Sequence, residues 1–327
     1  MRSLTNDQAV LVISDAVKLF PVGKRSLWDR ITRKPLRFVH AVDEVNLQVA
    51  KAETLVLLGE SGSGKTTLGR LVVGLETLTS GHIDLGGDEV RHLKDNGKLR
   101  GRLQMVFQDP TSSLDPFMKV LDCVVEPLRK SKLEKEQVIA RAMESLRNVG
   151  LEENLGWKKP SQLSQGQRQR VAVARAIVSK PDVIVLDEPT SSIDVSLQAQ
   201  VLNLLVKLQE TQGFTYVLIT HDPNVARFMA DNIAVMYLGK VAEYGPADSI
   251  LSNPRHPYTQ ALLASAPKPN ELSLPKPLSG EPPSMVSLPK GCRFAPRCPM
   301  VMERCKESHP PLFHQEGSLV ACYLYDH

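Results

Sequence analysis

The sequence lacks any hydrophobic run that is long enough to cross a membrane. Its longest apolar stretches, such as residues 183–186, have the length of a strand, whereas a spanning helix needs about 20 apolar residues. Residues 1–7 contain no apolar segment of the kind found in secretory signals. A membrane-spanning chain is therefore not expected, and we predict that the protein stays in the cytoplasm and reaches a membrane only peripherally.

The sequence also lacks a strong excess of charge and has few cysteines. The net charge is +4 over 327 residues, which by itself does not indicate nucleic acid or lipid as a partner. A basic segment, residues 24–37, is either a contact for anionic lipid or a partner, or a solvated insertion. Four of the five cysteines fall in the last 36 residues. Clustered cysteines in a cytosolic protein indicate a metal or cluster site more than disulfides.

Short apolar segments alternate with helical patterns along most of the chain. Strands are predicted at residues 10–13, 45–49, 54–58, 183–186 and 216–220, and an amphipathic helix over 134–149 with Gly150 as its stop. This alternation predicts an α/β fold with a mostly parallel sheet. Seven prolines among the 23 residues from Pro267 to Pro289 predict an extended linker before the cysteine-containing tail. Cys123, among apolar neighbours, is predicted to be a core residue.

A phosphate-binding loop follows the predicted strand 54–58. The pattern G-x-x-x-x-G-K-[ST] is matched by Gly59, Glu60, Ser61, Gly62, Ser63, Gly64, Lys65, Thr66 and Thr67. Glycines let the backbone N–H groups approach phosphate oxygens, and the helix predicted from about Lys65 presents its N-terminus to the anion. We expect Lys65 to reach the β- and γ-phosphates of a nucleotide and the Thr66 hydroxyl to bind Mg²⁺.

The strand 183–186 is followed by two acids, Asp187 and Glu188. Asp187 is a candidate Mg²⁺ ligand, and Glu188 is a candidate general base for an attacking water. An apolar strand ending in acids is common, so this assignment depends on the phosphate-binding loop earlier in the same domain.

A second helix start able to bind an anion is predicted at Ser164. The segment Leu163-Ser164-Gln165-Gly166-Gln167 precedes a helical pattern, and Ser164 is a plausible N-terminal cap. One ATP needs only one phosphate-binding loop. A second such helix end suggests that it serves the nucleotide of another chain.

Together these motifs resemble the ABC (ATP-binding cassette) ATPases, whose signature is usually Leu-Ser-Gly-Gly-Gln. Gln165 stands where the first of these glycines is usual. The resemblance covers about residues 8–265 and implies a P-loop NTPase core, RecA-like, with an antiparallel β subdomain and an ABC-type helical subdomain at about 110–170. It implies a catalytic set of Lys65, Gln108, Glu188 and His221, with Gln108 also near Mg²⁺. It further implies that Ser164, Gly166, Gln167 and Asp194 contact the nucleotide or the opposite subunit, and that Phe20, or alternatively Phe38, stacks on adenine.

The end of the chain resembles one branch of that family. Residues 256–263, 278–284 and 291–299 are similar to hallmarks of the oligopeptide/dipeptide and nickel importer ATPases. The resemblance implies a head-to-tail dimer with a second homologous ATPase, two integral membrane permeases and an extracytoplasmic binding protein. Peptides are the expected cargo, with nickel and oligosaccharides as alternatives. An ABC ATPase acting on DNA or ribosomes is disfavoured because neither a coiled-coil insertion nor a second cassette is present, and a redox or metal sensor would not require the complete catalytic set.

The tail itself is predicted to hold a metal. The boundary between the ATPase domain (1–265) and the linker with its C-terminal cysteine domain (266–327) lies at the start of the proline-rich stretch. Four thiolates can hold a [4Fe–4S] cluster or Zn²⁺, and metal-free cysteines are the third alternative. The candidate ligands are Cys292, Cys298, Cys305 and Cys322.

Overall fold

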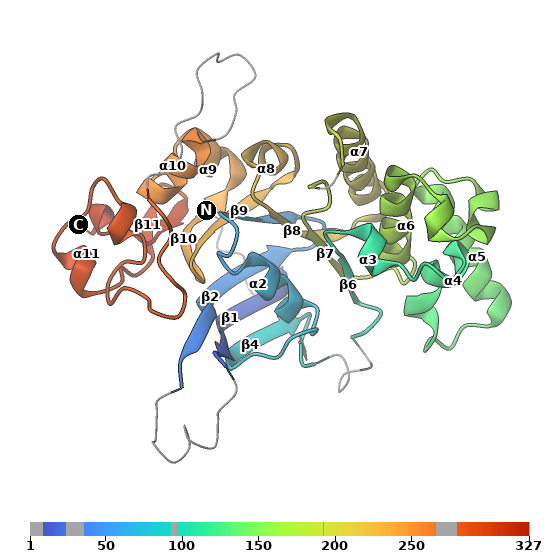
Figure 1. The fold of residues 1–327 in the computed structure, drawn as a ribbon, viewed down its shortest axis with the longest axis horizontal. Helices are drawn as coiled ribbons and strands as arrows, with labels where there is room; N and C mark the ends of the chain where they lie inside the picture. The colour runs from blue at the N-terminus through green and yellow to red at the C-terminus, as the bar shows by residue number, and fades with distance from the viewer. Residues whose placement is uncertain are drawn as a thin grey trace.

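Two β-sheets and a layer of helices make up the protein in the computed structural model (Figure 1). The structure describes residues 9–23, 36–92, 97, 99–191, 193–265 and 280–326. Most of the basic segment 24–37 and most of the predicted linker after Pro267 lie outside these residues. The predicted fold class is confirmed: a parallel α/β core carries an antiparallel sheet and a separate group of helices.

The first sheet is antiparallel and has the order β2-β1-β4-β5. Its strands are β1 (Ala9–Pro21), β2 (Phe38–Ala50), β4 (Ser80–Leu85) and β5 (Asp88–Glu89). The short apolar segments predicted strands only at 10–13 and 45–49, but β1 and β2 are each 13 residues long. Register shifts in their pairing explain the difference, because an irregular pairing interrupts strict alternation. At one shift Asp15 has φ 46° and donates its N–H to Asn46 Oδ1 at 2.8 Å.

The second sheet has the order β11-β12-β10-β9-β3-β8-β7-β6. The strands β3, β6, β7, β8 and β9 run parallel, and β10, β12 and β11 continue the sheet antiparallel. Their bounds are β3 Thr54–Leu58, β6 Leu103–Val106, β7 Val183–Asp187, β8 Thr215–Thr220, β9 Asn232–Tyr237, β10 Lys240–Pro246, β11 Phe313–Gln315 and β12 Ser318–Val320. Every residue of β3, β7 and β8 is buried, which explains their continuous apolar sequences.

Helices cover this sheet and extend to one side of it (Figure 1). The helices α2 (Lys65–Val72), α7 (Val195–Gln212), α8 (Pro223–Met229), α9 (Ala247–Ser252) and α10 (Pro257–Ala264) accompany the core strands. The helical group contains α3 (Pro110–Ser113), α4 (Val120–Val124), α5 (Lys135–Asn148) and α6 (Gln165–Ile177). The amphipathic helix expected at 134–149 is therefore present as α5. Helix α6 continues beyond residue 170, where the sequence predicted that the helical subdomain ends.

The cysteine-containing tail joins the main sheet rather than standing apart from it. We call residues 280–326 the appendage; it contains α11 (Arg304–Glu307) and the hairpin of β11 and β12. Strand β12 pairs with β10 in the register Glu243↔Val320. The predicted boundary near residue 266 thus separates segments that share one sheet. Figure 1 shows the appendage beside β10, at the opposite end of the molecule from the helical group.

Candidate nucleotide site

The candidate catalytic residues follow the ends of parallel strands. β3 leads into the phosphate-binding loop, β6 precedes Gln108, β7 ends at Asp187 and β8 precedes His221. Because the carboxyl ends of parallel strands meet at one edge of a sheet, residues up to 162 positions apart in the sequence converge there. This edge is where open α/β sheets bind their ligands.

The phosphate-binding loop has the backbone that its glycines allow. Gly59, Gly62 and Gly64 have φ values of 155°, 77° and 102°, which residues with a Cβ rarely adopt. Space is also limiting: a Cβ on Gly59 would lie 2.3 Å from the Met236 carbonyl oxygen, and one on Gly64 would lie 2.1 Å from that of Ala41. Helix α2 begins at Lys65, as predicted, so its free N–H groups face the loop.

The Lys65 ammonium is bound inside the loop. Its Nζ donates to the carbonyl oxygens of Gly59 at 2.7 Å and Glu60 at 2.8 Å, and to Ser63 Oγ at 3.3 Å. The side chain is buried, and burial lowers the pKa of Lys65 to about 8, while the charges of Glu188 and Asp187 oppose this shift. Lys65 is therefore close enough to both acids to interact with their charges. Its ammonium group is a cation that can bind a phosphate in this site.

Thr66 and Asp187 form a pair of oxygen donors next to the loop. Thr66 Oγ1 donates to Asp187 Oδ1 at 3.0 Å. Burial raises the pKa of Asp187, and the Thr66 hydrogen bond acts in the opposite direction. A hydroxyl and a carboxylate at this spacing are the hard oxygen ligands that suit Mg²⁺.

The two oxygens of the Glu188 carboxylate each contact one of two further candidate catalytic residues. Gln108 Nε2 donates to Glu188 Oε2 at 3.2 Å, and His221 Nδ1 lies 3.2 Å from Glu188 Oε1. Glu188 itself has φ 44°, an unusual conformation for a residue with a side chain. The three side chains, predicted from separate motifs, thus meet at one point beside Lys65.

The signature segment forms a capped helix start, as predicted. Ser164 Oγ accepts from the N–H of Gln167 at 3.3 Å, and Gln167 Oε1 accepts from the N–H of Ser164 at 2.9 Å, which together form a capping box. Ser164 is exposed and Gly166 is buried against α7, where an added Cβ would lie 3.1 Å from Leu197. No hydrogen bond joins Ser164 to the phosphate-binding loop within the described part of this chain.

Asp194 caps the next helix and is exposed. Its Oδ1 accepts from the N–H of Leu197 at 2.9 Å at the start of α7. The neighbouring Val195 is an apolar side chain that is 82% exposed. Ser192, two positions before Asp194, lies outside the described residues.

The aromatic candidates for adenine lie next to each other at the end of the first hairpin. Phe20 is the penultimate residue of β1, rather than following the strand, and it pairs with Val39, while Phe38 pairs with Pro21. Lys18 Nζ lies 4.8 Å from the centre of the Phe20 ring. Both rings are partly exposed, and the choice between them stays a prediction.

The four tail cysteines gather in the appendage. Cys292, Cys305 and Cys322 are buried, Cys298 is partly buried, and the Cys292 N–H donates to the Cys305 carbonyl at 2.7 Å. Burial, and to a lesser degree the other three thiols, raises the pKa of Cys322 to about 11. In the described chain, however, no three or more Cys, His, Asp or Glu side chains are arranged to hold a metal ion. The geometry therefore does not support the predicted metal site. Cys123 is buried in the core, as expected.

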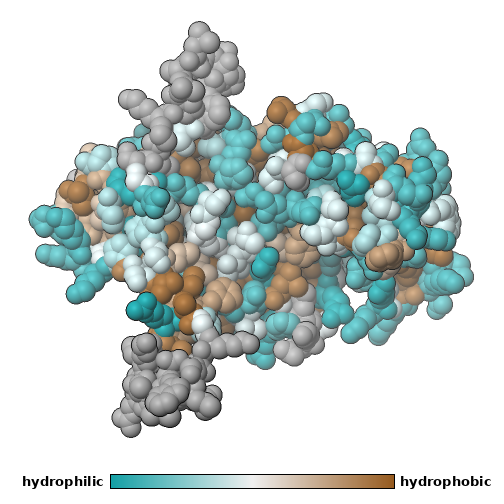
Figure 2. All heavy atoms as spheres, in the orientation of Figure 1, coloured by the Kyte–Doolittle hydropathy of each residue, from teal (hydrophilic) through white to brown (hydrophobic). Residues whose placement is uncertain are grey.

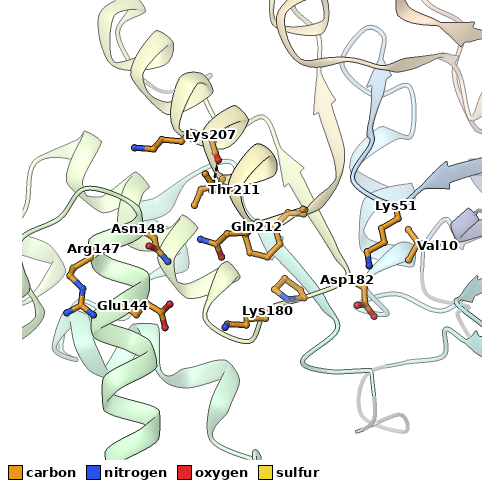
Figure 3. A pocket seen from close by; sticks show the side chains of 14 residues that line it. Val10, Lys51, Glu144, Arg147, Asn148, Lys180, Asp182, Lys207, Thr211 and Gln212 are labelled. Carbon is orange, nitrogen blue, oxygen red and sulfur yellow. Dashed lines mark hydrogen bonds between the residues drawn. The ribbon is translucent and has the colours of Figure 1, made fainter.

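A cavity of about 760 Å³ lies at the opposite, amino-terminal edge of the parallel strands (Figure 3). It is lined from α5 by Glu144 and Arg147, from α7 by Lys207 and Gln212, and from the segment between α6 and β7 by Lys180. None of the predicted nucleotide-site residues lines it. The cavity is therefore separate from the site built by Lys65, Asp187 and Glu188.

The appendage and α10 reach the phosphate-binding loop, which the sequence did not predict. Glu60 donates its N–H to Tyr258 Oη at 2.9 Å, and its carboxylate pairs with Arg297 at 2.7 and 3.1 Å. The hallmark segments 256–263 and 291–299 had indicated a family branch but no role for these residues.

No helix in the described chain is both long and apolar enough to span a membrane. Figure 2 shows hydrophilic side chains over much of the helical group, with apolar side chains between them. Two of the exposed apolar residues there are Phe117, 83% exposed, and Trp157, 58% exposed.

Comparison with known proteins gives two family matches and close full-length relatives. The family described as "ABC transporter" matches residues 42–191, and "Oligopeptide/dipeptide transporter, C-terminal region" matches residues 242–305. The dipeptide transport ATP-binding protein DppF of Escherichia coli strain K12 is 42% identical over 327 residues, which cover 98% of this chain and 96% of DppF. The oligopeptide transport ATP-binding protein OppF of the same organism is 39% identical over 340 residues, covering 100% and 99% of the two chains.

Solved structures agree with the fold. The dimeric ATP-binding cassette MJ0796, in a post-hydrolysis state bound to ADP and Pi, is 31% identical and superposes with a TM-score of 0.62. The match covers 72% of this chain and 98% of that one.

Proposed function

We propose that this chain, which belongs to the ATP-binding proteins of ABC transporters and is an ATPase of that family, powers an importer for oligopeptides or dipeptides. The ATPase mechanism is supported by one observation: Gln108 and His221 each contact one carboxylate oxygen of Glu188, near Lys65. The cargo is supported by the match of residues 242–305 to the peptide-transporter C-terminal region and by the names of the full-length relatives. Nickel and oligosaccharides remain the alternatives.

In the proposed reaction the loop Gly59–Thr67 and Lys65 bind the phosphates of ATP. Thr66 and Asp187 would hold Mg²⁺, which supplies charge neutralisation at the transferred phosphate when bound. Glu188 takes the proton of the attacking water, because its carboxylate is the acceptor that Gln108 and His221 orient. His221 is then placed to stabilise charge on the γ-phosphate.

We propose that the second half of each ATP site comes from a homologous ATPase subunit. Ser164, Gly166 and Gln167 would face the other subunit's nucleotide, and Asp194 would lie at the contact. Two features support this: Ser164 is an exposed helix cap whose helix start suits an anion, and Val195, beside Asp194, is 82% exposed. The partners would be a similar but separate ATPase, two membrane permeases and an extracytoplasmic binding protein.

The helical group is the proposed contact with the permeases at the cytoplasmic face of the membrane. Gln108 leads directly into α3, so a change at the γ-phosphate side of the site can move this group. The exposed Phe117 and Trp157 are large apolar side chains on the same group, and exposed apolar residues commonly mark a protein contact. The same mechanism would couple ATP binding to closure of the dimer, because ATP has a higher affinity for the closed state.

The cargo is tested by uptake in the source organism. A strain lacking this chain should lose uptake of labelled di- and oligopeptides, and plasmid-borne wild type, but not Glu188→Gln, should restore it. Uptake of the free amino acids, nickel and a labelled oligosaccharide serves as the comparison. Normal peptide uptake together with a loss of nickel or oligosaccharide uptake would contradict the peptide assignment and leave the ATPase role intact.

We also propose that Cys292, Cys298, Cys305 and Cys322 hold a [4Fe–4S] cluster, with Zn²⁺ as the alternative. The support is the residue content of the appendage: it has four free cysteines, three of them buried, and thiolates are the ligands of both groups. The described side chains are not arranged as a metal site, so binding would require them to rearrange. Protein purified without air is tested for colour, iron, sulfide and zinc. Iron and sulfide at about four per chain, lost on Cys298→Ser, would support the cluster; one zinc would support the alternative, and absence of both would reject a metal.

A further inference from the structure

Three contacts fix Glu60, the second residue of the phosphate-binding loop. Its carbonyl accepts from Lys65 Nζ at 2.8 Å, inside the loop. Its N–H donates to Tyr258 Oη at 2.9 Å, and its carboxylate forms a two-point pair with Arg297 at 2.7 and 3.1 Å. One residue therefore links the lysine of the loop to α10 and to the appendage.

Arg297 holds this carboxylate from a buried position. Its side chain is 3% exposed, whereas that of Glu60 is 27% exposed. The guanidinium also donates to Tyr237 Oη at 3.3 Å, with its Cζ 5.9 Å from the centre of the same ring. A two-point pair with a planar guanidinium fixes direction as well as distance. The position of the Glu60 carboxylate is thus determined by the appendage.

Aromatic packing keeps Arg297 and Tyr258 in place. The ring of Phe294, in the appendage, lies 5.4 Å from both Tyr237 and Tyr258, and the two tyrosine rings are 4.6 Å apart. Phe294 and Tyr258 are almost completely buried. Such contacts between aromatic rings are favourable, so the segment that carries Arg297 is fixed against the end of β9 next to the loop.

A second arginine of the appendage is linked to the loop indirectly. Arg293 pairs with Asp43 and donates to the Leu238 carbonyl. Asp43 in turn donates its N–H to the Gly239 carbonyl at 2.9 Å, and the Gly239 N–H donates to the Ser63 carbonyl at 2.8 Å. Among the described residues of the appendage, Arg297 hydrogen-bonds a loop residue directly, whereas Arg293 is linked to the loop through Asp43 and Gly239.

The electrostatic consequence concerns the phosphates of ATP. A carboxylate released near a triphosphate would repel it, because two like charges at short range in a partly buried site interact strongly. We propose that Arg297 is a positioning residue for ATP binding: it holds the Glu60 carboxylate away from the phosphates and so sets the ATP affinity of the phosphate-binding loop. This inference rests on the ATP-binding function proposed above.

The test measures ATP–Mg²⁺ binding by the full-length chain in wild type, Arg297→Ala, Glu60→Ala and the double variant. We expect Arg297→Ala to weaken affinity about tenfold when Glu60 is present, within the usual range of coupling between two groups. In the Glu60→Ala background the same change should cause no further loss, so the double variant should bind as Glu60→Ala does. In ATPase assays of the single Arg297→Ala variant the KM for ATP should rise by the same factor while kcat stays close to wild type. A purely structural role would predict the same loss of affinity in both backgrounds.

Arg304→Ala is the matched control. Arg304 belongs to the same appendage and pairs with a carboxylate, Asp326, at 2.8 Å, without contacting the loop, so its removal should leave ATP affinity unchanged. If Arg297→Ala does not fold, Arg297→Gln replaces it, with the same expected order of affinities. Unchanged affinity in a folded Arg297 variant, or an equal further loss when Arg297→Ala is added to Glu60→Ala, would overturn the proposal. Failure of the wild type to bind ATP would instead contradict the nucleotide-binding function.

Discussion

Tyr258 and Glu60 are 198 positions apart in the sequence, yet the Tyr258 hydroxyl accepts the N–H of Glu60 at 2.9 Å. The hydroxyl is therefore a part of the phosphate-binding loop's support, although it belongs to a helix near the end of the ATPase core. Glu243 places that helix: its two carboxylate oxygens accept the N–H groups of Arg255 and His256 at 2.9 and 3.0 Å, just before α10 begins.

Tyr258→Phe should weaken ATP binding several-fold and lower the free energy of unfolding by about 1–3 kcal/mol, the cost of leaving a buried N–H without its partner. The ring and its packing are retained, so the change isolates the hydroxyl. Nucleotide titration and chemical denaturation measure the two effects. The control is Tyr216→Phe, which removes a buried hydroxyl that donates to the Leu205 carbonyl at 3.1 Å, away from the loop. It should lower stability with no change in ATP affinity; equal affinity in both variants would contradict the role of Tyr258.

The nucleotide site could be predicted from the sequence because its parts follow strands in a fixed geometry. The motifs at Gly59, Asp187 and His221 each come after an apolar run, and parallel strands place such positions at one edge. The contact of Arg297 with Glu60 could not be predicted, since the residues are 237 positions apart and no local pattern specifies which carboxylate an arginine meets. The full length of β1 was missed for a different reason: its irregular pairing at Asp15 breaks the alternation on which strand prediction depends.

Glu188→Gln should retain ATP binding and lower hydrolysis by about 10²–10⁴-fold, the usual effect of losing a general base. Glutamine keeps the size of the side chain and its hydrogen bonds to Gln108 and His221, but it cannot take the proton of the attacking water. ATP should then hold the dimer closed, which size-exclusion chromatography with the partner ATPase would detect. Glu210→Gln, at an exposed position of α7, is the control and should behave as wild type. Undiminished turnover of the assembled Glu188→Gln transporter would contradict the assignment.

Gln165→Gly, which restores the residue usual in the signature, should leave ATPase activity of the assembled transporter nearly unchanged. Gln165 is exposed and is the first residue of α6, with no positive φ that would require glycine. The stability of α6 should fall by no more than about 1 kcal/mol, the usual penalty of glycine in a helix.

Gly166→Ala provides the contrast, because its Cβ would lie 3.1 Å from the side chain of Leu197, which would have to shift by a few tenths of an ångström at the contact between α6 and α7. We expect this variant to lose activity while Gln165→Gly does not. The reverse order in the ATPase assay would show that the backbone at position 165, rather than 166, has to approach the nucleotide.

ATP affinity should fall as the pH rises above about 8. Burial lowers the pKa of Lys65 to about 8 in the nucleotide-free protein, and the phosphates of bound ATP raise it again. The ATP-bound form therefore holds more protons than the free form between pH 8 and 10, and affinity decreases by up to about tenfold per pH unit in that range. The stability of the nucleotide-free chain changes with pH in the opposite direction. Because the pKa of Lys65 in the folded chain lies below the usual 10.5, the charged lysine destabilises the fold at low pH. This destabilisation is lost as the pH rises from about 8 to the usual 10.5.

Isothermal titration at pH 9 in two buffers of different ionisation enthalpy measures the proton uptake directly. Wild type should take up close to one proton per ATP under these conditions, because free Lys65 is mostly neutral there. Lys65→Met should bind ATP weakly and without proton uptake, whereas Lys207→Met, which alters an exposed lysine of α7, should match wild type. Affinity that stays constant from pH 7.5 to 9.5 would mean that Lys65 remains charged in the free loop, and its contacts with the carbonyls of Gly59 and Glu60 would then be those of a cation throughout.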